Sequence, residues 1–277
     1  MKTTRLIASL SLLSFIACQN NAPKQSVESK DDIHDQSDHE AHLETVEEIM
    51  LEKNGIKIYS IGEVEQFEDA KLELANYTVD SNDESLYRFE FGVSNYELKA
   101  QTNAHQGHCA NSEKGQHIHF VLNNAPYEAH YEPNIESTLL EGNNVVLAFL
   151  SRSYHESIKH KNAFVLKNIA LGENAGAFDE SAPHLFYSRP KGEYVGDDTK
   201  RILLDFYLVN ANLQADNYQV RVLIDDEEFV LDSWQAYFVE GLSMGEHTFR
   251  IQLIDQEGNL VPGPFNDSGD RIIQLKA

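Results

Sequence analysis

From residue 56 onward, short runs of apolar and aromatic residues alternate with turn residues. Runs such as KLELANYTV, LYRFEFGVSNY, HIHFVL and NVVLAFL have the length of strands and end at Asn, Gly or Pro. Runs of the same kind, among them RILLDFYLVN, NYQVRVLI and HTFRIQLI, follow in the second half. The pattern predicts an all-β protein made of antiparallel sheets.

The two halves of this β-rich region can be aligned with each other. FEFGVSNYELKA matches LDFYLVNANLQA, and HIHFVLNNAPYEAH matches QVRVLIDDEEFVLD. Such an internal repeat predicts two tandem immunoglobulin-like β-sandwich domains, at 45–171 and 183–277, joined by a linker at 172–182. Between its matched segments the first copy carries an insertion, QTNAHQGHCANSEKG.

The segment before the first strands has a different character. TVEEIMLEKNG predicts a short helix, because Thr45 and Glu48 form a capping box and Gly55 follows as a stop signal. Residues 18–44 are polar and acidic and contain three histidines. A segment of this composition cannot bury enough apolar surface to fold alone, so we expect a flexible tether.

Residues 1–17 have the pattern of an export signal, with Lys2 and Arg5 before an apolar run. Ala17 directly before Cys18 resembles the lipobox of bacterial lipoproteins. The resemblance implies a mature chain that begins at lipid-modified Cys18 and is anchored to a membrane. Gln19 follows the cysteine, which favours the outer membrane, with the domains facing the periplasm or the cell surface.

The formal net charge of −23 makes binding of nucleic acid unfavourable. The sequence has two cysteines, so Cys109 is the only thiol left if Cys18 carries lipid. The cores then hold together without an internal disulfide. Cys109 is a buried thiol, is paired with another chain, or is a ligand.

Histidines supply the candidate chemistry. His117 and His119 are two apart in a predicted strand, so both point to one side, while Ile118 and Phe120 face a core. If Asn123 and Asn124 form a two-residue turn, His117 lies opposite His130 on the returning strand. Three imidazoles on one surface suit copper or zinc.

The predicted strand directions bring the insertion and the loop SRSYHESIKHK to the same end as these histidines. That end collects His105, His108, Cys109, Arg152, His155, Glu156 and His160. We expect the first three as additional metal ligands. Arg152, His155 and Glu156 are instead candidates for contacting an anion or another ligand. A solvated histidine face, or a polar ligand-binding face without metal, are the alternatives.

Sequence motifs for catalysis are missing: there is no Gly-rich phosphate loop, no G-x-S-x-G and no HExxH. The three-histidine arrangement resembles the zinc site of carbonic anhydrase in geometry only, since the remaining sequence differs from that enzyme. We therefore expect a protein that binds rather than catalyses.

Segments of both halves, among them APHLFYSRPKGEYVG, WQAYFVEGL, GQHIHFVLNNAPYEAHY and FLSRSYHES, resemble a family of bacterial lipoproteins with tandem immunoglobulin-like repeats. Some members carry a phosphopeptide-binding label. Ser151-Arg152-Ser153-Tyr154-His155 has one residue too many for the Ser-Arg-x-His signature of forkhead-associated domains. The resemblance implies an exported tandem-sandwich lipoprotein and leaves the ligand open.

The sequence thus predicts a membrane-anchored binding lipoprotein that binds copper or zinc. The alternative is a non-catalytic interaction module that recognises a peptide, a phosphopeptide or a glycan at the same loop end.

Overall fold

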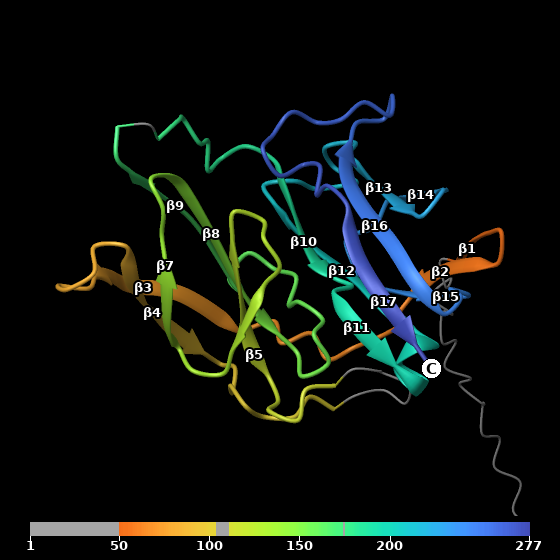
Figure 1. Ribbon diagram of the computed structural model, residues 1–277, viewed down its shortest axis with the longest axis horizontal. Helices are drawn as coiled ribbons and strands as arrows, with labels where there is room; N and C mark the ends of the chain where they lie inside the picture. The colour runs from red at the N-terminus through yellow and green to blue at the C-terminus, as the bar shows by residue number, and fades with distance from the viewer. Residues whose placement is uncertain (1–49, 104–110, 174) are drawn as a thin grey trace, which may run out of the picture. The chain divides into compact units, whose positions relative to one another are not determined.

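The computed structural model describes residues 50–103, 111–173 and 175–277 (Figure 1), all of which belong to one compact unit, Val46–Ala277. The prediction of an all-β protein is confirmed: apart from one 3-10 helix, η1 (Gly196–Thr199), the regular elements of these residues are strands. No described helix has the length and apolarity to cross a membrane. The predicted signal, the lipid site at Cys18 and the tether lie outside the described residues.

The first sandwich consists of two antiparallel sheets, and each sheet turns its apolar face to the other. One sheet has the order β3-β4-β7 and the other the order β6-β5-β8-β9. Their core contains Phe89, Phe120, Ala148 and Leu150. The strands are β3 (Lys71–Val79), β4 (Leu86–Ser94), β5 (His117–Leu122), β6 (Glu128–His130), β7 (Asn134–Thr138), β8 (Gly142–Ser151) and β9 (Phe164–Leu171).

The second sandwich repeats this arrangement. Three strands in the order β15-β12-β10 face four in the order β17-β16-β13-β14, and β11 adds to β17 in parallel. The strands are β10 (His184–Arg189), β11 (Gly192–Val195), β12 (Ile202–Val209), β13 (Gln219–Ile224), β14 (Glu227–Leu231), β15 (Tyr237–Glu240), β16 (Gly245–Ile254) and β17 (Arg271–Lys276). The seven strands β3 to β9 thus correspond in order and pairing to β10 and β12 to β17. This correspondence confirms the predicted immunoglobulin-like fold and its tandem repeat.

The N-terminal hairpin differs from the prediction. Residues 50–60 form strands β1 (Met50–Lys53) and β2 (Ile56–Ser60) around a turn at Asn54 and Gly55, both with positive φ. The predicted helix is wrong here, because the Asn-Gly pair favours a tight hairpin turn over a helix end. Strand β2 pairs with β15, so the hairpin extends a sheet of the second sandwich and not the first domain, where residues 45–171 were expected.

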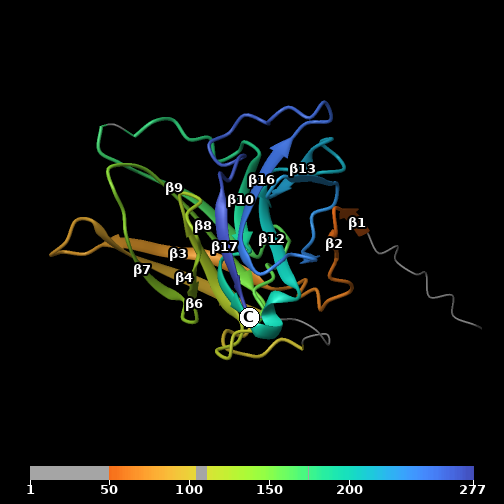
Figure 2. The ribbon, with the colours of Figure 1, turned by 45° about the vertical axis from the view of Figure 1, so that its right-hand side comes forward.

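The central strands β5 and β8 of the sheet β6-β5-β8-β9 are buried on both faces. The inner face of this sheet packs on β3-β4-β7, whereas its outer face packs on β10 and β12 of the second sandwich (Figure 2). This second contact contains Val121, Leu147 and Phe149 from one side and Phe186 and Tyr207 from the other. The rings of Phe149 and Tyr207 stack with centroids 4.6 Å apart. We call this contact the inter-sandwich layer.

Candidate metal centre

Strand β5 places two histidines in the inter-sandwich layer. The strand alternates as predicted: Ile118 and Phe120 enter the first core, and His117 and His119 point to the opposite side. Both imidazoles have 0% exposed surface: Ser188 on β10 of the second sandwich lies beside His119, and the rings of Tyr131 and His155 lie beside His117. A solvated histidine face is therefore excluded.

A third histidine arrives from the loop that follows β8. A bridge between Ser151 and Ser157 closes this loop, and within it the N–H of His155 donates to the carbonyl of Arg152 at 2.9 Å. His155 has φ of 72°, a left-handed conformation that costs a non-glycine residue roughly 1 kcal/mol. The loop holds this strained backbone while the ring of His155 points at β5.

Arg152 and Glu156 hold the loop from inside. They are 2% and 4% exposed, and Arg152 Nη1 lies 3.4 Å from Glu156 Oε1. Tyr154 donates its hydroxyl to Glu156 Oε2 at 2.8 Å, and Arg152 also donates to the carbonyl of Glu65. The expectation that Arg152 and Glu156 contact an external ligand is therefore wrong. Their charges are buried and paired with each other, although Arg152 Nε has no hydrogen-bond partner, and the pair helps to position His155.

The three rings converge on one point. His117 Nε2 lies 2.9 Å from His119 Nε2 and 3.1 Å from His155 Nδ1, and the remaining pair, His119 Nε2 and His155 Nδ1, is 3.5 Å apart. Three nitrogens bound to one ion at 2.0–2.1 Å lie about 3.3–3.6 Å apart. Shifts of a few tenths of an ångström would open the cluster enough to hold an ion.

The positions of the ring protons leave a conflict among the three nitrogens when no cation is bound. His117 Nδ1 lies 2.8 Å from the carbonyl of Gly115, which only accepts, so the proton sits on Nδ1 and His117 Nε2 carries a lone pair. Either His119 or His155 donates to that single lone pair. If only one of them donates, the lone pair of the other nitrogen faces the lone pair of His117 Nε2. If both donate, two N–H groups share the single lone pair of His117 Nε2. A cation that accepts all three lone pairs removes the conflict.

The surroundings keep the rings neutral. Burial lowers the pKa of His117 to about 4 and that of His155 to about 2, and it lowers the pKa of His119 well below its ordinary value. The positive charge of Arg189 lowers all three values further. Neutral imidazoles are the form that binds metal, so at neutral pH no proton has to leave first.

Aromatic and polar side chains surround the cluster. The ring of Tyr127 stacks on His119 with centroids 3.6 Å apart, and its hydroxyl lies 3.3 Å from His155 Nδ1. On the other side of His119, Ser188 Oγ of the second sandwich lies 3.5 Å from Nδ1. Lys191 reaches across the sandwiches and donates to the carbonyl of Tyr127 at 2.6 Å. The site therefore depends on both sandwiches.

His130 does not join the cluster, although the turn itself forms as predicted, with Asn123 and Asn124 at φ of 52° and 55°. His130 lies opposite Ile118, one position away from the predicted partner His117. Pro126 follows the turn and has no N–H for the ladder, so the returning strand contains one extra residue before pairing begins. A slip of one residue turns every side chain to the other face.

The slip has two effects on the site. It turns His130 toward Phe120 and Glu128, whose Oε2 lies 3.1 Å from His130 Nε2. It also brings Tyr127 onto the histidine face, a role that was not predicted from the sequence. Pro126 is the sequence feature from which both effects could have been predicted. Of the other predicted residues, His160 binds the carbonyl of Phe67 at 3.1 Å, and His105, His108 and Cys109 lie outside the described residues.

No protein-family model matches the chain, and no curated protein matches it. Among solved structures, the fibronectin(III)-like modules of CbhA from Clostridium thermocellum are 12% identical, with a TM-score of 0.24 over 72% of this chain and 93% of that one. The FN1–FN3 domains of chicken CNTN1 are 10% identical, with a TM-score of 0.24 over 80% and 70%. The glucan-utilisation protein SGBP-B of Bacteroides ovatus is 10% identical, with a TM-score of 0.20 over 74% and 47%.

Proposed function

We propose that the protein binds a transition-metal ion, copper or zinc, through His117 Nε2, His119 Nε2 and His155 Nδ1. The observation that supports this most directly is the convergence of three neutral, buried imidazole nitrogens within 3.5 Å of one another. The carbonyl of Gly115 fixes the orientation of His117, as a polar partner behind a metal ligand usually does.

The charge around the site favours copper in its monovalent state. Three neutral imidazoles contribute no negative charge, and among the described residues no Asp or Glu oxygen belongs to the ligand group. Arg189 and Lys191 add positive charge nearby, as their effect on His155 shows. Repulsion from these cations is twice as large for a divalent as for a monovalent ion. Cu(I) also accepts the low coordination number that three imidazoles offer.

The same observations favour binding over catalysis. A metal that activates water needs a base and an open position. The described part of the site offers Tyr127 next to the ligands, and burial raises the pKa of its hydroxyl, so this group stays protonated. We therefore propose a binding protein.

The test is metal binding by the purified chain and by matched variants. We expect about one Cu(I) per chain in an anaerobic competition with a Cu(I) chelator, and tighter binding of Cu(I) than of Zn²⁺ in a parallel titration. Replacing His119 or His155 by Gln should weaken binding by more than about 100-fold. His130→Gln is the matched control and should bind like the original chain.

Other results would contradict the proposal. Uptake that survives His117→Gln/His119→Gln, but is lost when the histidines of 18–44 or the group His105, His108 and Cys109 are replaced, would place binding outside this cluster. Stoichiometric metal uptake that depends on His130 would instead support the pairing of His117 with His130 that the sequence predicts.

A further inference from the structure

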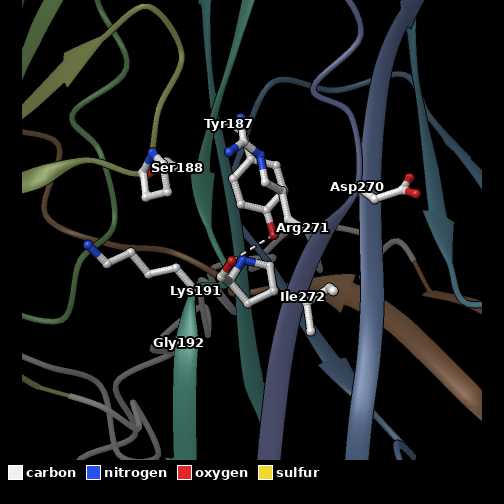
Figure 3. Close-up of a pocket in the computed structure, with 9 residues that line it drawn as sticks. Tyr187, Ser188, Lys191, Gly192, Asp270, Arg271 and Ile272 are labelled. Carbon is white, nitrogen blue, oxygen red and sulfur yellow. Dashed lines mark hydrogen bonds between the residues drawn. The ribbon is translucent and has the colours of Figure 1, made fainter.

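A second candidate site lies beside the inter-sandwich layer, separate from the metal ligands. It is a pocket of about 480 Å³ between the loop that carries Pro126, the turn between β10 and β11, and the start of β17 (Figure 3). This volume is within the range of small-molecule sites, roughly 300–1,000 Å³. The two sandwiches contribute its walls together.

Most of the pocket wall is apolar. Pro126 comes from the first sandwich and Pro190 and Ile272 from the second. Side chains along β17 alternate between the two faces of the sheet: Ile273 points into the core, whereas Ile272 points outward and is 59% exposed. An exposed branched side chain beside two prolines forms a surface that an apolar group can cover.

Two cations complete the pocket, and neither makes an ion pair within 4.0 Å among the described residues. Figure 3 shows Tyr187 and Arg271 together in the centre of the view and Lys191 on the left. Arg271 donates to the carbonyl of Asn124 and lies 5.4 Å from the ring centroid of Tyr187, and its Nε is buried with no hydrogen-bond partner. Lys191 contacts the carbonyl and the ring of Tyr127.

The neighbouring acid does not neutralise these charges. Asp270 faces Arg250, with Oδ1 3.4 Å from Nη1. Glu128 acts on Lys191 electrostatically without forming an ion pair, whereas the contacts of Arg271 are a carbonyl oxygen and a ring. In a chain with a net charge of −23, two such cations at one apolar pocket are an unusual concentration of positive charge. An anion would supply the missing counter-charge, and guanidinium groups suit carboxylates in particular.

We propose that this pocket binds a small amphiphilic carboxylate, with its acid group between Lys191 and Arg271 and its apolar body against Pro126, Pro190 and Ile272. This inference goes beyond metal binding and does not depend on it. The two sites adjoin at Ser188, which lines the pocket and lies 3.5 Å from His119 Nδ1.

The test uses 3-phenylpropionate as a probe, with 3-phenylpropionamide and inorganic phosphate as comparisons. Binding is followed by titration calorimetry and by NMR shifts of Ile272. We expect the carboxylate to bind at least about tenfold more tightly than the amide, and Lys191→Met or Arg271→Gln to remove that difference. Lys71→Met, at an exposed position, is the control and should change nothing.

Ile272→Glu provides a variant that should fold normally, because the side chain is largely in solvent. It should abolish binding by removing apolar contact and adding a like charge. Equal affinity for acid and amide, equal affinity for phosphate, or binding that survives Ile272→Glu would overturn the proposal. The experiment is repeated with metal-free His117→Gln/His119→Gln protein. If this variant still binds 3-phenylpropionate, the pocket is independent of the metal site. If it does not, the claim that the two sites are independent is wrong.

Discussion

The two sandwiches share one strand plan but use the outer face of an equivalent strand in opposite ways. On β5 the outward residues His117 and His119 are fully buried, whereas on β13 the equivalent Gln219 and Arg221 are half-buried. His119 lies opposite Phe149, and Arg221 lies opposite Gln252. Arg221 donates to Gln252 and to the carbonyl of Gly258, on a sheet face that water reaches. The chemistry of each outer face therefore depends less on the strand itself than on whether another sheet covers it.

Exchanging the two equivalent residues should break this comparison most strongly. His119→Arg places a charge without a counter-ion in a dry layer that already contains Arg189, and we expect a loss of about 5 kcal/mol or more in the free energy of unfolding. Arg221→His on the solvent-accessible face of β13 should cost less than about 1 kcal/mol. Urea unfolding of both variants is the measurement, and similar losses in the two would show that the layer is wet.

The buried ion pair between the sandwiches should give the next largest effect. Lys159 Nζ of the first sandwich contacts Oδ1 of Asp205 on β12, and Asp205 is fully buried. Lys159→Met leaves the carboxylate uncompensated and should cost about 3–5 kcal/mol. The double variant Lys159→Met/Asp205→Leu should recover most of the loss in the same unfolding assay. A single variant with unchanged stability would contradict the buried pairing.

Acid should weaken the metal-free first sandwich through its histidines. The folded-state pKa of His117 is about 4, below the value near 6.5 of the unfolded chain, so between these values the unfolded chain binds more protons. Stability should therefore fall as pH falls from 6.5 to 5, by about 2 kcal/mol for His117 alone. The measurement is the urea midpoint across this range in a chelating buffer. His117→Gln should reduce the slope, and an unchanged slope would contradict the assignment.

The smallest effect is expected at the histidine that the register slip removes from the site. His130 is partly exposed and pairs with the exposed Glu128, so His130→Gln should change stability by less than about 0.5 kcal/mol. Pro126→Ala sharpens the comparison, because it restores an N–H at the position where the ladder is interrupted. Because the proline causes the slip, proton–proton contacts in NMR should connect residue 130 of this variant with His117. A retained contact with Ile118 would show that other packing sets the register.

Much of the fold was visible in the sequence because local rules governed it. Period-two alternation in HIHFVL placed Ile118 and Phe120 in the core, and the Asn123-Asn124 turn formed as expected. Strand directions also brought the loop of His155 to the histidine end. The errors arose where one residue or a distant partner decided the outcome. Pro126 changed the register, and the cover on β5 came from strands far along the chain, although the apolar run in β8 already indicated burial on both faces.

The N-terminal hairpin has a consequence for how the chain matures. Strand β2 pairs with β15, so β1 and β2 are synthesised well before the strand that completes their sheet. Closing the long loop between β2 and β15 has an entropic cost, so we expect this pairing to form late in folding. If a protease cut the chain between β9 and β10, the two fragments would stay associated through the pairing of β2 with β15. The covalent connection between the two sandwiches is therefore not needed to hold them together.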